Sequence, residues 1–309
     1  ESHAASFALL VYVSAWLKCH EPAVFTCALL NSQPMGFYAP AQLVQSARRA
    51  GVEVRPVAVN SSDWDSSLEA MPDGRHALRL GLRLVSGLGR AAGDRIMGQR
   101  ADRPYQDAQD LHERTGLPQH ELGALAAAGA LAGIAGHRHR ARWAVAGAEP
   151  PLPVWPVLRI AEGIPLLRPP SEGQDIAADY QSLGLTLGRH PLALLRARLH
   201  GLGISAAMQL QEMRDETAVH TAGIVTTRQR PGSAGGVTFV TLEDETGYVN
   251  VIVWRQLGDR QRRVLLESRL LGVRGRVQRQ GDVLHVVAAH LEDHSELLGQ
   301  LPTRSRDFS

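Results

Sequence analysis

A short glycine-rich turn near residue 88 has a spacing that suits phosphate binding. Gly87-Leu88-Gly89 follows alternating leucines at residues 78–84, which predict a strand, and precedes a helical segment. Glycines at such a turn allow backbone N–H groups to approach one DNA phosphate, a contact that positions DNA without reading its sequence. Arg83 and Arg90 flank the turn and would add salt-dependent affinity. The pattern predicts a helix-hairpin-helix that binds DNA through Arg83, Gly87, Gly89 and Arg90.

Two other interpretations of this turn compete with the first. Ala92 completes the Gly-x-Gly-x-x-Ala pattern of a dinucleotide-binding turn, and Asp107 and Asp110 lie near the distance expected for its acidic residue. That fold also needs a second strand, whereas residues 100–105 are polar and broken by a proline. The other alternative is a glycine turn that only packs against its neighbours.

A second set of candidates lies in the last third of the chain, where apolar residues alternate along strands. Val249, Val251 and Val253 share one strand face, which leaves Tyr248, Asn250, Ile252 and Trp254 opposite. The strand from residue 270 likewise separates Leu271, Val273 and Val277 from Arg274, Arg276 and Gln278. Three strands, a helix and two further strands between about 217 and 294 follow the order of an OB-fold barrel.

Aromatic and basic residues of this barrel are the candidate contacts for single-stranded nucleic acid. An OB-fold stacks bases on aromatic side chains beside a basic groove, at roughly 1–3 kcal/mol per stacked base. The candidates are Phe239, Tyr248, Trp254, Arg228, Arg230, Arg255, Arg274 and Arg276. The alternative is that Phe239 belongs to the core and that the arginines are merely solvated.

The sequence predicts neither a catalytic nor a metal site within this chain. Asp63 and Asp65 fall in a loop, and Glu243-Asp244-Glu245 fall in a hairpin turn, where acidic residues are ordinary turn formers. His137-Arg138-His139-Arg140 is expected to be a solvated basic turn, because histidines two apart do not share a helical face. Cys19 and Cys27 are expected to be buried free thiols of a protein from a reducing, cytoplasmic compartment.

The composition and length indicate a multidomain α+β chain. It has 309 residues, 44% of them hydrophobic, and a net charge of only +2, with Lys18 as its one lysine. No apolar run reaches the roughly 18 residues that a membrane span requires, so no membrane partner is expected. Because the chain starts at Glu1 inside a helical pattern, we expect it to be part of a longer protein. The expected parts are a helical region at 1–75, the helix-hairpin-helix region at 76–146, a Pro-rich linker with a helical connector at 147–216, the OB-fold at 217–294 and a tail at 295–309.

Taken in order, these segments resemble the bacterial C-family, or DnaE-type, DNA polymerases. The resemblance rests on Ser2-His3-Ala4-Ala5-Ser6-Phe7-Ala8 with Trp16-Leu17-Lys18, Leu80-Gly81-Leu82-Arg83-Leu84-Val85 with Gly87-Leu88-Gly89, Ala128-Gly129-Ala130-Leu131, Leu183-Gly184-Leu185 with His190-Pro191, and Thr241-Leu242-Glu243-Asp244-Glu245-Thr246-Gly247 with Val253-Trp254. It implies that residues 1–75 end the polymerase fingers domain. Residues 147–185 contain no clamp-binding peptide and the chain stops soon after the barrel, as in the error-prone branch of the family.

The resemblance also implies an activity and partners for the whole protein. These are DNA synthesis from deoxynucleoside triphosphates on primed, partly single-stranded template, with Mg²⁺ held by a palm domain outside this chain. Ser2 and His3 would lie near the incoming nucleotide or the template. The error-prone branch implies translesion synthesis in damage-induced mutagenesis, with accessory mutagenesis proteins that bring the sliding clamp. Two alternatives remain open: a non-enzymatic helix-hairpin-helix and OB-fold protein that binds single-stranded DNA, and a tRNA-binding OB module of a synthetase.

Overall fold

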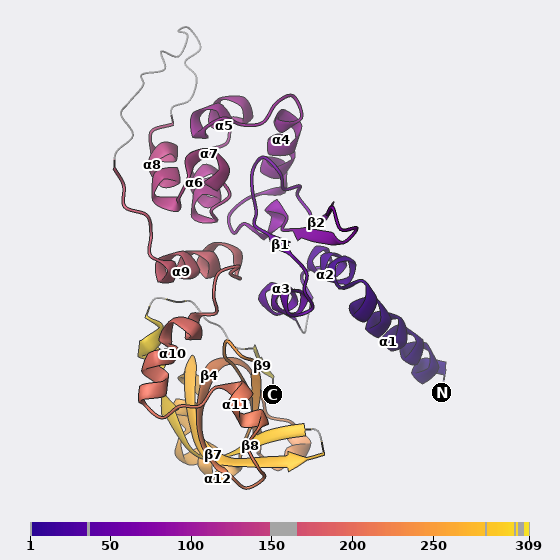
Figure 1. Cartoon of the computed structure of the whole chain (residues 1–309), viewed down its shortest axis with the longest axis vertical. Coiled ribbons are helices and arrows are strands. Elements are labelled where there is room, and N and C mark those ends of the chain that lie inside the picture. Colours follow the sequence, from indigo (N-terminus) through magenta and orange to yellow (C-terminus); the bar gives the residue numbers. More distant parts are fainter. Residues whose placement is uncertain are drawn as a thin grey trace. The chain divides into compact units, whose positions relative to one another are not determined.

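The chain forms two compact units, residues 1–187 and residues 188–309 (Figure 1). The computed structural model describes residues 2–35, 38–148, 166–281, 283–299, 301 and 306–308. Helices dominate the first unit and a β-barrel dominates the second, which confirms the expected multidomain α+β class. The finer division into five parts stays a prediction. Most of the expected Pro-rich linker, residues 149–165, lies outside the described residues.

The first unit consists of helices around a small three-stranded sheet. The sheet has the order β1-β3-β2, with β1 parallel and β2 antiparallel to β3. Its elements are α1 (Ser2–His20), α2 (Pro22–Asn31), α3 (Pro40–Arg49), β1 (Val54–Arg55), β2 (Ser67–Ala70), β3 (His76–Arg79), the 3-10 turn η1 (Leu82–Leu84), α4 (Arg90–Arg100), α5 (Ala108–Thr115), α6 (Gln119–Ala127), α7 (Ala132–Ala135), α8 (Arg138–Ala146) and α9 (Glu172–Leu183).

The predicted strand over residues 78–84 is wrong beyond Arg79. The chain passes so close to Asp65 at Gly81 that a Cβ there would lie 2.4 Å from the Asp65 carbonyl carbon. The backbone then turns into η1, where Leu82 N–H donates to the Asp63 carbonyl at 2.8 Å. Leu78, Leu80 and Leu82 are fully buried and Leu84 is partly buried, because both the strand and the 3-10 turn face the core. The spacing of the leucines therefore did not distinguish the two structures.

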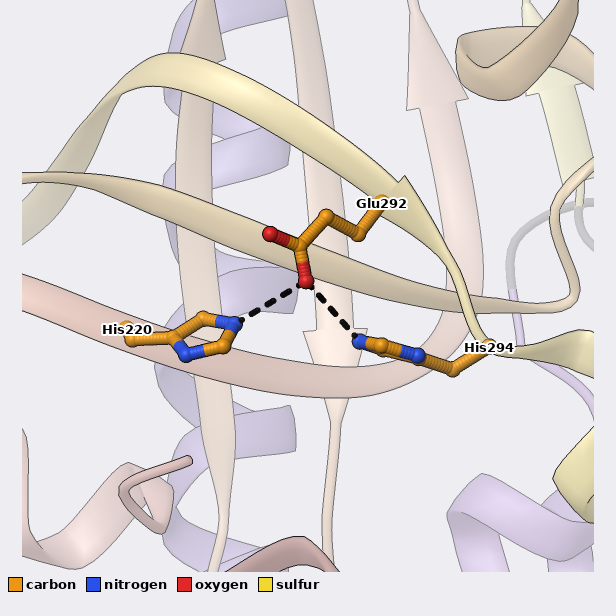
Figure 2. Close-up of side chains that lie close together, drawn as sticks. All are labelled: His220, Glu292 and His294. Atoms are coloured by element: carbon orange, nitrogen blue, oxygen red, sulfur yellow. Dashed lines mark ion pairs between the residues drawn. The ribbon is translucent and has the colours of Figure 1, made fainter. Parts of the chain in front are cut away.

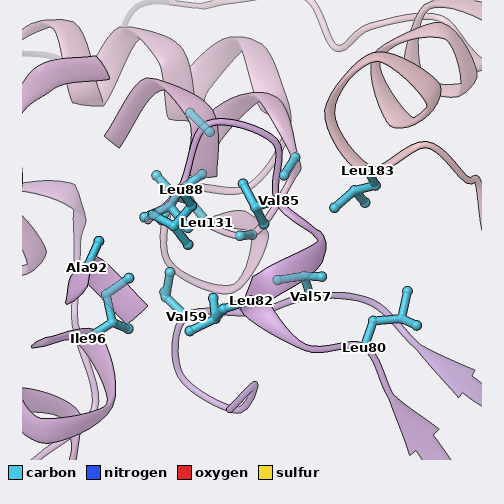
Figure 3. Close-up of a cluster of buried hydrophobic side chains, with 14 of the residues drawn as sticks. Val57, Val59, Leu80, Leu82, Val85, Leu88, Ala92, Ile96, Leu131 and Leu183 are labelled. Atoms are coloured by element: carbon cyan, nitrogen blue, oxygen red, sulfur yellow. The ribbon is translucent and has the colours of Figure 1, made fainter. Parts of the chain in front are cut away.

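A cluster of buried aliphatic side chains joins η1 to α4 and to the helices that follow (Figure 3). It contains Leu82 from η1, Leu88 from the glycine turn and Ile96 from α4, with Leu131 after α6 and Leu183 at the end of α9. Leu82, Ile96 and Leu131 are fully buried. The glycine turn is therefore fixed by apolar packing on both sides.

The segment 137–140 starts a helix and is not the solvated turn that we expected. His137 caps α8, and its Nδ1 accepts a hydrogen bond from the Arg140 N–H at 3.4 Å. Arg138 forms ion pairs with both Asp175 and Asp179 of α9, and its Nε donates to the Ala127 carbonyl at 2.8 Å. Arg138 thus fastens α8 to α6 and α9.

The second unit is a closed barrel with helices at its ends. The strands follow the cyclic order β4-β5-β6-β8-β7, closed by pairing of β5 with β4, and β9 extends the sheet beside β4. This connectivity confirms the predicted OB-fold. Its elements are α10 (Pro191–Gly201), α11 (Ala207–Gln211), β4 (Ala218–Gln229), η2 (Gly232–Ala234), β5 (Thr238–Glu243), β6 (Tyr248–Val253), α12 (Arg255–Arg260), α13 (Arg262–Glu267), β7 (Leu270–Gln280), β8 (Val283–Asp293), η3 (Ser295–Leu298) and β9 (Arg306–Phe308).

The interior of the barrel is built from the alternating residues that the sequence indicated. Val249, Val251, Val253, Leu271, Val273 and Val277 all belong to the buried cluster of the barrel. Leu210 of α11 is fully buried in the same cluster and covers one end of the barrel. The side chains opposite these residues are therefore placed on the outer surface.

The two cysteines differ in their surroundings. Cys27 of α2 is a buried free thiol, as expected, and burial raises its pKa. Cys19 of α1 is exposed, so the prediction that it is buried was wrong. In the described part of the chain, no helix is both long enough and apolar enough to cross a membrane.

Candidate nucleic-acid interface

The glycine turn predicted to bind phosphate lies between η1 and the first residue of α4. Gly87 has a φ of +86°, a left-handed conformation that glycine adopts without strain. Gly89 is the N-cap of α4 with an ordinary φ of −83°. α4 leads into α5 and not into a strand, so the dinucleotide-binding interpretation is wrong.

A carboxylate from α6 already lies at this turn. Oε1 of Glu121 accepts a long hydrogen bond of 3.4 Å from the Gly89 N–H, and Oε2 lies 3.5 Å from Nη2 of Arg95. The helix N-terminus attracts this negative charge as it would attract a phosphate. A DNA phosphate at Gly89 would consequently have to displace Glu121.

The two arginines predicted to flank the turn have different surroundings. Arg83 donates to the carbonyl oxygens of Asn31 at 2.6 Å and Gln33 at 2.9 Å, and it pairs with Asp65. Arg90 is exposed, its Nε pairs with Oδ1 of Asp94 at 2.9 Å, and its guanidinium carbon lies 5.5 Å from the ring centre of Trp64. A phosphate that reached Arg90 would compete only with this exposed pair, whereas Arg83 holds the α2–α3 segment in place.

The acidic residues that could be mistaken for a magnesium site form ion pairs with arginines or accept hydrogen bonds within a turn. Asp63 pairs with Arg100 at 2.8 Å. Asp244 accepts from Thr246 N–H at 2.7 Å and Gly247 N–H at 3.0 Å, as expected of a turn-forming residue. Mg²⁺ requires several free oxygen ligands in octahedral geometry, and these pairs do not offer them.

One row of outward-facing residues crosses four strands of the barrel. Phe239 of β5 pairs with Ile252 of β6, which pairs with Val287 of β8, which in turn pairs with Arg276 of β7. Phe239 is 38% exposed. The Arg276 side chain is 67% exposed, and its Nη1 lies 3.5 Å from Oε2 of the equally exposed Glu216. Three strand spacings make this row roughly 14 Å long. An aromatic ring and a guanidinium at opposite ends of an apolar strip suit a nucleotide chain laid across the strands.

The other predicted contacts gather at the end of β6 and beside it. Trp254 caps α12 and is 56% exposed, and Tyr248 at the start of β6 is half-buried opposite Glu243. Arg230 and Arg255, with the nearly buried Arg228, line a pocket of about 290 Å³ between the β4–β5 connection and α12. This pocket is a second basic surface next to Trp254.

Arg228 is placed differently from its prediction as a surface contact. It is 5% exposed, and Nε donates to the Leu265 carbonyl at 2.7 Å while Nη2 donates to the Ser268 carbonyl. A bulge between Val225 and Thr227 shifts the register of β4, so that Arg228 lies on the buried side. Its guanidinium supports the end of α13.

The first residues of the chain, predicted to lie near nucleotide or template, are in the first turn of α1. That turn includes Ser2 and His3, whose side chains are outside the described part of the structure.

A group of three side chains on the outer barrel surface was missed from the sequence (Figure 2). Oε2 of Glu292 lies 3.3 Å from Nε2 of His220 and 3.3 Å from Nε2 of His294. Oε1 of Glu292 pairs with Nε of Arg274 at 2.6 Å, so Arg274 is not a free cation. Burial alone would raise the pKa of Glu292, but the positive charges of these neighbours hold it below its usual value. The Glu-x-His spacing at the end of β8, with His294 one residue beyond the strand, was the available signal.

Two known domain families match the two nucleic-acid-binding regions. The helix-hairpin-helix motif matches residues 51–141, and the OB-fold nucleic acid binding domain matches residues 219–293. They coincide with the glycine turn on its helical core and with the closed barrel.

Proteins named error-prone DNA polymerase are similar to this chain over its full length. The protein of Alkalilimnicola ehrlichii is 60% identical over 308 residues, that of Methylococcus capsulatus 53% over 326, and that of Aromatoleum aromaticum 54% over 312. Each alignment covers 100% of this chain. The whole chain is homologous to one part of the error-prone DNA polymerases. It spans only 30%, 31% and 29% of the length of these three relatives.

Similarity to solved structures is weak. Asparaginyl-tRNA synthetase from Pyrococcus horikoshii matches 29% of this chain and 22% of its own, at 21% identity and a TM-score of 0.26. A likeness at this level has no bearing on function.

Proposed function

We propose that this chain is the DNA-binding, C-terminal part of an error-prone DNA polymerase. The observation that carries the proposal is the 60% identity to such a polymerase over the whole chain, with both nucleic-acid-binding domains in place. The full protein would extend primed DNA past damaged bases during damage-induced mutagenesis. A synthetase module or an independent single-strand binder would not account for identity that extends across both units.

In this proposal the barrel holds the single-stranded template. Phe239 stacks a base, and Arg276 at the other end of the same row neutralises a phosphate. The helix-hairpin-helix holds duplex DNA through the Gly87–Gly89 turn and the exposed Arg90. Both contacts lack sequence readout, as a polymerase that copies any template requires.

The catalytic groups belong to the rest of the polymerase. Deoxynucleoside triphosphates and Mg²⁺ would bind to a palm domain outside this chain, and accessory mutagenesis proteins would supply the link to the sliding clamp. Most of the apolar side chains along α1 are exposed, which suits a helix that packs against another part of a longer protein. These residues are Phe7, Leu9, Leu10, Val11, Tyr12, Val13 and Trp16.

The proposed DNA binding is tested by measuring the affinity of the 309-residue chain for single-stranded, primed and duplex DNA across a salt series. Arg276→Ala should weaken binding to single strands and reduce the slope of log affinity against log salt by about 0.7 to 1, the contribution of one phosphate contact. Arg274→Ala should weaken binding less, because Arg274 pairs closely with the mostly buried Glu292 at 2.6 Å, whereas the pair of Arg276 with Glu216 is longer, at 3.5 Å, and exposed on both sides.

Arg263→Ala is the matched control, because Arg263 of α13 is 87% exposed but lies outside the row. Equal salt slopes for Arg276→Ala and Arg263→Ala would contradict the proposed path. For the activity itself, the full-length protein should extend a primed template. If it extended none, the polymerase assignment would fail while the DNA-binding result could stand.

A further inference from the structure

The atoms of the His220–Glu292–His294 group converge on one point. Both Nε2 atoms are buried, lack a hydrogen-bond partner of acceptable geometry, and face the same carboxylate oxygen (Figure 2). A histidine pair that only stabilised the carboxylate would be expected to direct its N–H groups along hydrogen bonds. Two imidazole nitrogens that lie 3.3 Å from one carboxylate oxygen without a well-aligned hydrogen bond instead resemble ligands arranged around a cation.

The distances agree with the geometry of zinc coordination. Ligands bound to zinc at about 2.0–2.1 Å in a tetrahedron lie about 3.3 Å from one another. The two nitrogen–oxygen distances here are both 3.3 Å. All three ligand atoms lie within 4.8 Å of one another. The distance between Nε2 of His220 and Nε2 of His294 therefore has to shorten by at most about 1.5 Å to reach the tetrahedral value, and rotation of one imidazole ring supplies this change.

The fold brings these ligands together across an intervening strand. His220 is on β4, whereas Glu292 is near the end of β8 and His294 follows it, and β7 runs between them. Gly272 of β7 pairs with Glu292 and has no side chain to fill the space above the sheet. The ring of His294 occupies that space and reaches toward His220.

The remaining contacts of Glu292 prepare it for one bond to a metal. Nε of Arg274 pairs with Oε1 of Glu292 at 2.6 Å. This contact fixes the carboxylate and leaves Oε2 directed at the two histidines. Metal-binding carboxylates are commonly held by such an outer hydrogen bond. Two imidazole nitrogens and a single oxygen favour zinc over Mg²⁺ or Ca²⁺, which prefer several oxygen ligands.

We propose that His220 Nε2, Glu292 Oε2 and His294 Nε2 form a zinc site on the outer surface of the barrel. The fourth position is left to water. Bound zinc would fasten β4 to the end of β8 across β7, beside the strand that carries Arg274 and Arg276.

Zinc titration of the metal-stripped 309-residue chain by calorimetry tests this site. We expect one strong site, which His220→Gln and His294→Gln each weaken by about tenfold or more. His290→Gln is the control, because His290 is exposed on the same strand and outside the cluster. Excess Mg²⁺ should not displace the zinc.

A thermal melt gives a second readout that does not depend on counting metal. Zinc should raise the melting temperature of the wild-type chain and of His290→Gln, because ligand that binds only the folded state stabilises it. At the same zinc concentration it should raise that of His220→Gln or His294→Gln by less, because their zinc affinity is lower. Circular dichroism checks that both variants fold without zinc. Failure of the wild-type chain to bind zinc, or equal binding by all variants, would overturn the proposal.

Discussion

Gly272 lies directly beneath the imidazole ring of His294, and a Cβ atom at position 272 would come within 2.7 Å of the ring atoms Cδ2 and Nε2. The same Cβ would lie 3.2 Å from Cβ of Glu292. The glycine is therefore needed for space and not for backbone conformation, since its φ is not in the left-handed region. A single methyl group should force the ring away from its position.

Gly272→Ala should accordingly disturb both the barrel and the proposed zinc site. Crowding of this kind costs typically about 1–3 kcal/mol of unfolding free energy, and displacement of His294 should weaken zinc binding by about tenfold or more. Chemical denaturation and zinc titration measure the two effects. Gly201→Ala is the control, because a Cβ at Gly201 of α10 meets nothing within 4 Å. Unchanged stability and zinc affinity in Gly272→Ala would show that the imidazole of His294 can shift without losing its contacts.

Arg228 and Arg230 should separate stability from DNA binding. Arg228→Ala leaves the carbonyls of Leu265 and Ser268 without their donor, at a cost of about 1–3 kcal/mol each. Arg230→Ala removes an exposed side chain from the basic pocket and should change stability by no more than about 0.5 kcal/mol. Arg228→Ala should therefore lower the stability measured by urea denaturation without weakening single-strand binding. Arg230→Ala should weaken single-strand binding without lowering the stability. Weaker DNA binding by a fully stable Arg228→Ala variant would contradict this assignment.

The contrast between these arginines marks the limit of prediction from the sequence. The alternation of Val249, Val251 and Val253 is local, and it was enough to predict that these three side chains share the buried face of β6. Arg228 was misplaced because one bulge in β4 exchanged the two faces of the strand beyond it. No local sequence pattern in β4 predicts this bulge.

The zinc ligands were missed for a different reason. Glu292 and His294 are two residues apart at the end of β8, but His220 joins them only through the register of β4, β7 and β8. That register depends on packing between distant segments. Likewise, the sequence predicted the helix-hairpin-helix turn but not that Glu121 of α6 would lie at its N–H group.

Acid should destabilise the second unit through His190 before its carboxylates are protonated. Burial lowers the pKa of His190 from 6.5 to about 4, although the negative charges of Glu245 and Asp244 oppose this shift and Arg196 adds to it. The unfolded chain then binds more protons than the folded chain between about pH 6.5 and 4. Stability should fall as the pH decreases through that window, by about 3 kcal/mol in total.

His190→Asn tests the source of this pH dependence. Nδ1 of His190 accepts from the Leu192 N–H at 3.2 Å at the start of α10, and asparagine can also cap a helix without titrating. Unfolding free energies of the variant should vary less between pH 6.5 and 4 than those of the wild-type chain. Parallel curves for the variant and the wild-type chain would show that His190 is not the source of the acid sensitivity.

Phe239 should contribute to single-strand binding by stacking and not by holding the fold. Its ring lies on the outer surface of β5 and is 38% exposed, so Phe239→Ala should cost little stability. Loss of one stacked base should weaken binding to single-stranded DNA by about 1–3 kcal/mol, while Phe239→Trp should keep most of the affinity. Fluorescence anisotropy with a labelled oligonucleotide measures both. Met208→Ala, which removes an exposed apolar side chain from α11, is the control for general loss of apolar surface. If Phe239→Ala and Met208→Ala bound equally well, the nucleotide path would have to avoid Phe239, and the basic pocket beside Trp254 would become the better candidate.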